Sequence, residues 1–145
     1  MSDDGKTPWH LWVVGIVYLL WSAMGALDYT MTQTRNAAYM AQFTPEQLAY
    51  FYSFPSWMVA GWAIGVWGGA IGSLFLLLRR RWAVSAFWIA FAGTCVGALY
   101  MFVGAQTAVT DIAGPFEIAF SLVILVLSGG IIWYAYRMRE RHVLR

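Results

Sequence analysis

The chain has 145 residues, of which 61% are apolar and 11% are charged, and its formal net charge is +2. Soluble domains carry roughly 45–50% apolar and about 25% charged residues, and a small soluble fold leaves too much surface in water to hide this much apolar side chain. The composition therefore excludes an ordinary soluble domain and predicts that lipid surrounds much of the chain. The length allows one domain, without room for a catalytic module beside a membrane module.

Four apolar runs are each long enough to cross a bilayer, whose hydrocarbon core of about 30 Å requires about 20 helical residues. Pro8 is a typical first-turn residue for the first run, and acids precede it where a secretory signal would carry net positive charge. Only Arg79, Arg80 and Arg81 separate the second and third runs, which predicts a tight antiparallel hairpin. We therefore predict an all-α, polytopic membrane protein, a four-transmembrane-helix bundle with spans at residues 9–28, 56–78, 82–103 and 116–136.

Positive charge is concentrated on one side of this predicted bundle. If the loops alternate across the bilayer, eight of the nine basic residues fall on one side, and only Arg35 falls on the other. Short loops rich in Lys and Arg stay in the cytoplasm, so we predict a bacterial inner-membrane protein with both termini cytoplasmic. We interpret the basic tail as an anchor at the anionic leaflet and expect no nucleic-acid partner. The topology anchors in this orientation are Arg79, Arg80, Arg81, Arg137, Arg139 and Arg141.

The loop between the first and second spans contains a helix signal of its own. Thr44 can cap a helix, Pro45 suits its first position, and Gln47 can complete a capping box with Thr44. The aromatic residues that follow predict a short amphipathic helix over residues 45–54, too short to span a membrane. We expect it to lie along the outer interface or to fold over the mouth of the bundle. The preceding residues, 30–42, either continue the first helix or form a loop.

Glycines recur at helical spacing in the second and third spans. Gly61, Gly65 and Gly69 are four residues apart, and Gly93 and Gly97 belong to a small-residue face of the third span. Small residues let two helix backbones approach closely in lipid. We predict that these two faces pack on each other within the hairpin. A dimer interface, or close passage of a ligand, is the alternative.

Acidic residues at the outer ends of the spans suggest a candidate site. Asp28 ends the first span and Glu117 begins the fourth, with Asp111 and Arg35 in the neighbouring outer loops. Acids near a membrane core are costly and are often functional, although the helix dipole alone suffices to explain an acid in the first turn, where Glu117 lies. The functional hypothesis is a polar cluster of these four residues at the outer mouth that holds a cation, a proton or a polyol.

Catalytic and metal-binding patterns are missing from the sequence. It contains no zinc-type His-Glu motif, no nucleophile elbow and no phosphate-binding loop. The single cysteine, Cys95, lies far along the chain from His10 and His142, so these three residues do not make a metal-ligand pattern. We therefore expect no enzymatic activity, no metal and no cofactor.

The stretches TPWHLWVVG, WSAMGALDYTMTQTRNAAYM and FTPEQLAYFYSFP resemble a family of small four-span inner-membrane proteins of alphaproteobacteria. The resemblance covers nearly the whole chain and is most specific in the first helix and the outer loop. Members often carry the automatic label "sugar transporter", which implies a solute class but neither a mechanism nor site residues. Two functions stay open. One is an accessory or structural subunit that packs in a larger membrane complex or a homo-oligomer. The alternative is an oligomeric transporter of a small sugar- or polyol-like solute.

Overall fold

The computed structural model describes residues 6–104 and 114–145, and these residues form helices joined by short connections. Four helical stretches are long and apolar enough to cross a membrane. The chain is therefore a multi-pass, all-α membrane bundle of four long helices, which confirms the predicted fold class. The elements in chain order are α1 (Trp9–Gln33), α2 (Ala37–Met40), α3 (Pro45–Tyr52), α4 (Ser56–Leu77), α5 (Trp82–Leu99), the π-helix η1 (Tyr100–Gly104) and α7 (Gly114–Glu140).

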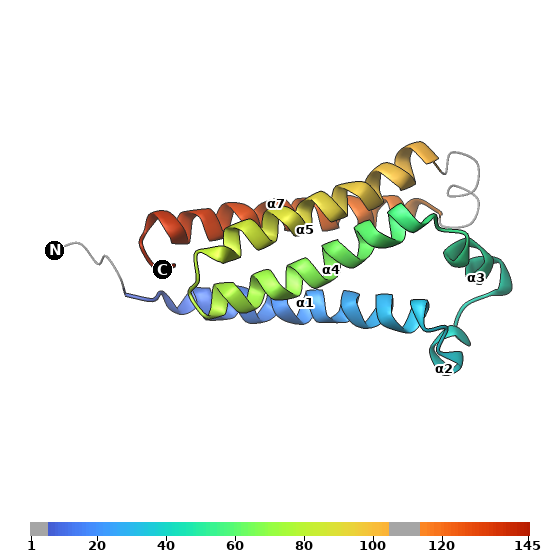
Figure 1. Ribbon diagram of the computed structural model, residues 1–145, viewed down its shortest axis with the longest axis horizontal. Helices are drawn as coiled ribbons and strands as arrows, with labels where there is room; N and C mark the ends of the chain where they lie inside the picture. The colour runs from blue at the N-terminus through green and yellow to red at the C-terminus, as the bar shows by residue number, and fades with distance from the viewer. Residues whose placement is uncertain (1–5, 105–113) are drawn as a thin grey trace.

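The four long helices run side by side, with α4 packed against both α1 and α5, and α7 packed against α5 (Figure 1). The start of α1, the α4–α5 loop and the end of α7 lie together at one end of the bundle, which we call the basic end because it carries the arginines of residues 79–81 and 137–141. Helices α2 and α3 lie at the opposite end (Figure 1), which we call the aromatic end.

Helix α1 is longer than the predicted first span. Its 25 residues extend about 37 Å, several ångströms more than the hydrocarbon core. The helix therefore continues beyond Asp28 to Gln33, and α2 follows after a short turn, with the Asn36 side chain accepting a hydrogen bond from the backbone N–H of Tyr39. This resolves the choice between a longer first helix and a loop.

Helix α3 begins as its sequence signal predicts. The Thr44 hydroxyl accepts from the backbone N–H of Gln47 at 3.3 Å, and the Gln47 side chain accepts from the backbone N–H of Thr44 at 3.0 Å. Pro45 occupies the first helical position. The two hydrogen bonds complete the capping box and fix where the outer loop becomes helical.

Helices α4 and α5 pack backbone to backbone through glycine. A Cβ added to Gly93 would lie 2.6 Å from the Gly61 carbonyl oxygen and 2.7 Å from the Gly65 backbone nitrogen. Neither distance leaves room for a methyl group, so the two predicted glycine faces meet at these three residues. This is the small-residue packing that lipid favours, since helices there associate through van der Waals contact.

Two of the predicted packing glycines lie elsewhere. A Cβ added to Gly69 would lie 2.8 Å from Ser22 Oγ, so this glycine faces α1 and not α5. A Cβ added to Gly97 would meet no atom within 4 Å. The α4 glycines therefore serve two neighbouring helices, because α4 lies between α1 and α5.

The C-terminal segment closes the basic end. The backbone N–H of Arg145 donates to the Arg79 carbonyl at 2.7 Å, and the N–H of Arg81 donates to the Arg145 carbonyl at 2.9 Å. Val143 and Leu144 are buried. The tail is thus part of the folded core as well as a carrier of positive charge. The hydrophobic cluster that it joins consists of Leu11, Leu76, Ala83, Val84, Phe87, Ile131, Ile132, Ala135, Met138, Val143 and Leu144.

Three helices end on non-glycine residues with left-handed backbone. Arg35, Arg79 and His142 have φ values of 51°, 55° and 56° and follow α1, α4 and α7. In each case the next backbone N–H bonds to a carbonyl five residues earlier, as in a Schellman motif. The chain therefore turns sharply at each of these ends. The three hydrogen bonds are Asn36 to Met31, Arg80 to Phe75 and Val143 to Met138.

Candidate functional site

Asp28, the first of the predicted outer acids, is engaged by α2. The Tyr39 hydroxyl donates to Asp28 Oδ1 at 2.7 Å. This hydrogen bond, with smaller contributions from burial and from the Asp28 charge, raises the pKa of Tyr39 to about 12. The carboxylate therefore fastens α2 to the last turns of α1, a structural role for an acid at this depth.

Arg35 has an aromatic partner of its own. Its guanidinium carbon lies 4.4 Å from the centre of the Tyr52 ring, a cation–π contact that joins the end of α1 to the end of α3. The structure thus gives Asp28 and Arg35 different partners. Asp111 lies outside the described residues. Glu117 lies in the first turn of α7, and its side chain is not among those that the structure describes. The four-residue polar cluster stays a prediction.

Aromatic rings join the segment that follows α3 to α4 and η1. The Phe54 ring lies 5.5 Å from that of Tyr100 in η1 and 6.4 Å from that of Trp62 in α4, both edge to face. Phe51 meets Phe43 in the same geometry, at 5.2 Å. Such edge-to-face pairs stabilise by about 0.5–1.5 kcal/mol each beyond their buried area. These rings join the residue that follows α3 to α4 and η1, while no residue of α3 itself is buried.

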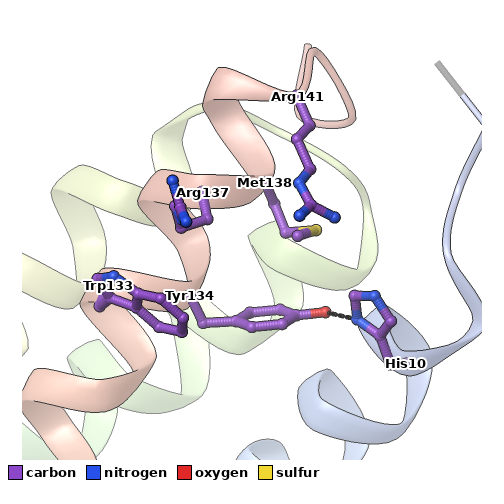
Figure 2. A pocket seen from close by; sticks show the side chains of 6 residues that line it. All are labelled: His10, Trp133, Tyr134, Arg137, Met138 and Arg141. Atoms are coloured by element: carbon purple, nitrogen blue, oxygen red, sulfur yellow. Dashed lines mark hydrogen bonds between the residues drawn. The ribbon is translucent and has the colours of Figure 1, made fainter. Parts of the chain in front are cut away.

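A pocket of about 190 Å³ lies at the basic end, between the start of α1 and the last turns of α7. Figure 2 shows its six lining side chains. One comes from α1, four come from the last turns of α7, and Arg141 directly follows that helix. Positions 134, 137 and 138 recur at the spacing of one helix face. The lining residues are His10, Trp133, Tyr134, Arg137, Met138 and Arg141.

A hydrogen bond between His10 and Tyr134 forms the floor of this pocket. His10 Nδ1 and the Tyr134 hydroxyl oxygen are 2.5 Å apart, and the two rings meet edge to face at 5.7 Å. Either group can be the donor, depending on the imidazole tautomer. In both arrangements one donor hydrogen stays outside this bond, on the second ring nitrogen or on the hydroxyl. The pair therefore offers a hydrogen-bond donor to a ligand.

Two arginines line the same pocket, Arg137 in the last turn of α7 and Arg141 directly after the helix. The Arg137 guanidinium lies over the Trp133 ring, 5.6 Å from its centre, and its Nη1 is 3.8 Å from Glu140 Oε2. Figure 2 shows the Arg141 guanidinium on the side of the pocket nearer His10. A cavity with two cations and a hydrogen-bond donor is suited to an anion that carries several acceptor oxygens.

The sequence predicts a topology anchor at the basic end but does not predict this pocket. His10 and Tyr134 are 124 residues apart in the chain, and a single sequence contains no signal that pairs them. The recurrence of arginine every two to four residues after Tyr136 was visible, but the same pattern is typical of any cytoplasmic helix end.

The described residues hold no group of three His, Cys, Asp or Glu side chains close enough to bind a metal ion. Comparisons of the chain with protein-family models, with curated proteins and with solved structures found no match. The fold alone therefore defines its class, a multi-pass membrane protein with four membrane-spanning helices.

Proposed function

We propose that this chain is an accessory or structural helical-bundle subunit of a bacterial inner-membrane assembly, and that α7 supplies an interface for partner helices. The observation that supports the proposal is an uncovered pair of glycines in the middle of α7. Gly129 and Gly130 are exposed, and a Cβ added to either would meet no atom within 4 Å.

Outward-facing glycines do not stabilise a helix whose outer face contacts only lipid. They lower helix propensity and have no side chain with which to contact acyl chains. Small residues do favour close approach of another helix, which makes them typical of helix–helix interfaces in membranes. Val126 and Trp133 flank the glycines one turn away on each side, with 73% and 62% of their surfaces exposed. The two glycines between these larger side chains leave room for a neighbouring helix to approach the α7 backbone.

The interior of the bundle favours this proposal over transport by a single chain. Among the described residues with placed side chains, the buried polar groups are four hydroxyls. The Ser73 hydroxyl donates to the Gly69 carbonyl of its own helix, and the partly buried Thr94 hydroxyl donates to the Ala90 carbonyl in α5. Such an interior offers few groups to a polar solute. The buried hydroxyl residues are Ser22, Thr32, Ser73 and Ser128.

The orientation belongs to the same proposal. With the basic end in the cytoplasm, the arginines of residues 79–81 and 137–141 lie at the anionic leaflet, as the positive-inside rule requires. Green fluorescent protein fused after Arg145 then fluoresces, and alkaline phosphatase at the same position stays inactive. The reverse pattern would contradict the orientation.

The proposed interface is tested by placing larger side chains at the exposed glycines of α7. We expect the native protein, extracted in a mild amphiphile, to stay with other membrane subunits in native mass spectrometry. The Gly129→Leu/Gly130→Leu variant should be released as a monomer while it keeps its melting temperature, because a Cβ at either position meets no described atom within 4 Å. Ala23→Leu is the matched control, since Ala23 is exposed on α1. A native protein that is monomeric after mild extraction would contradict the proposal.

The transport alternative gives a different result in the same experiment. It requires a symmetric homo-oligomer, because four helices enclose little volume. That oligomer would show a melting temperature that rises with added sugar or polyol. A hetero-complex without such a response supports the subunit.

A further inference from the structure

The pocket between α1 and α7 lies at the depth of lipid headgroups. His10 is the second residue of α1, and Tyr134 lies six residues before the end of α7, about 9 Å along the helix. Trp9 and Trp133 stand beside these two residues with 76% and 62% of their surfaces exposed. Indole rings settle at the boundary between headgroups and acyl chains. The pocket therefore opens toward this boundary and not into the bundle interior.

Positive charge in the pocket exceeds what the protein neutralises. Arg137 and Arg141 are four residues apart at the end of α7 and line the same pocket, so their like charges repel. The only carboxylate paired with them among the described residues is Glu140, which is 3.8 Å from Arg137, and both side chains of this pair are about half exposed. Water screens such a pair strongly. An anion bound between the arginines would remove their repulsion.

The partial charges of the two helix ends at the pocket oppose each other, so the arginines determine the sign of the electrostatic potential there. The start of α1 presents the positive end of a helix dipole, without an acid in its first turn or a side-chain cap. The end of α7 presents a negative end, but the N–H groups of His142 and Val143 bond to its last carbonyls. The two partial charges oppose each other, so the two guanidinium groups dominate.

We propose that this pocket binds the phosphate of an anionic phospholipid headgroup. The phosphate oxygens lie between Arg137 and Arg141. The donor hydrogen that is not used in the His10–Tyr134 bond is donated to a phosphate oxygen. The acyl chains stay in the bilayer beside Trp133. Basic pockets between transmembrane helices at the cytoplasmic side are a common form of headgroup site.

The proposal is tested on the purified full-length protein with phosphatidylglycerol as the probe. Binding is followed by native mass spectrometry and by the rise in melting temperature in a zwitterionic detergent. We expect saturable binding to the native protein and about fivefold weaker binding to Arg137→Gln and to Arg141→Gln, since one basic residue near an anionic surface contributes about that factor. The double variant should show no saturable binding.

Arg139→Gln is the matched control. Arg139 belongs to the same turn and carries the same charge, but its guanidinium lies over the Tyr136 ring at 4.6 Å and does not line the pocket. It should bind phosphatidylglycerol as the native protein does. Glu140→Gln provides a test in the opposite direction, because it frees Arg137, and it should bind up to about fivefold more tightly.

Three outcomes would overturn the proposal. One is a loss in Arg139→Gln equal to that in the pocket variants, which would indicate attraction to the overall charge of the tail. Another is equal stabilisation by phosphatidylcholine, which would show that the anionic charge does not matter. The third is equal stabilisation by inorganic phosphate or glycerol 3-phosphate at the same concentration, which would identify a soluble phosphate compound as the ligand.

Discussion

Gly93 of α5 lies against Gly61 of α4 so closely that a Cβ on Gly93 would be 2.6 Å from the Gly61 carbonyl oxygen. The opposing atom belongs to helix backbone, which cannot rotate away as the end of a side chain can. This contact therefore sets the separation of α4 and α5. In lipid, where helices gain little from the hydrophobic effect, such close van der Waals contact is a main source of association.

Gly93→Ala should consequently destabilise the bundle. The added methyl group must push α4 and α5 apart, and overpacking of this kind costs about 1–3 kcal/mol of unfolding free energy. Denaturation of the purified protein in micelles, followed by circular dichroism, measures the change. Gly97→Ala is the control, because its Cβ meets no atom within 4 Å. Equal stability of the two variants would show that the two helices are not in backbone contact.

The folded-back tail makes a second prediction. Leu144 is 5% exposed and belongs to the hydrophobic cluster at the basic end, so Leu144→Ala should lower the unfolding free energy by about 2 kcal/mol or more. Arg145→Ala should change it little, because the side chain is exposed and its two hydrogen bonds to the α4–α5 loop come from the backbone. The same micelle denaturation compares them. A tail that only anchors the topology would give the same small effect in both variants.

Most of the fold follows from local sequence signals. Apolar runs of about 20 residues define membrane-spanning helices because backbone groups in lipid must bond within the helix. The Thr44 capping box is equally local, since both hydrogen bonds join residues three apart. The helix ends at Arg35, Arg79 and His142 are harder to predict, because residues other than glycine rarely adopt the left-handed conformation.

The candidate sites depended on contacts that the sequence does not encode locally. Asp28 is visible in the sequence as an acid at the end of a span, but its partner Tyr39 belongs to a four-residue helix whose main signal is the Asn36 cap. The contact between His10 and Tyr134 joins two helices that meet only in the folded bundle. Positions along a single sequence identify unusual residues, whereas the packing of α1 beside α7 decides which of them face each other.

The Asp28–Tyr39 hydrogen bond predicts a pH dependence at the aromatic end. The pKa of Tyr39 is raised from the usual 10.0 to about 12, so the bond stabilises the folded state fully below pH 10. That contribution is lost as the pH rises from 10 to 12, since the phenolate cannot donate. The phenolate absorbance of the native protein is measured against pH, and that of the Tyr39→Phe variant is subtracted from it. The difference reports the titration of Tyr39 alone, and its midpoint should lie near pH 12.

The Asp28→Asn background provides the control for this titration. The same subtraction in that background should give a midpoint closer to the usual pKa of 10.0, because the hydrogen bond to a carboxylate and the nearby negative charge are both removed. Midpoints that agree in the two backgrounds would mean that Asp28 does not bind Tyr39 in solution.

The left-handed residue after α7 gives the last prediction. His142 is exposed with φ 56°, and its backbone N–H bonds to the Arg139 carbonyl at 3.0 Å. Glycine adopts this conformation without the steric cost of a Cβ, roughly 1–2 kcal/mol, but it loses more backbone entropy on folding. His142→Gly should therefore raise the unfolding free energy by roughly 0.5–1 kcal/mol. The β-branched His142→Val should lower it, since that side chain tolerates positive φ poorly. Thermal unfolding of both variants in micelles makes the comparison, and a glycine variant no more stable than the valine variant would show that the tail does not turn at this residue.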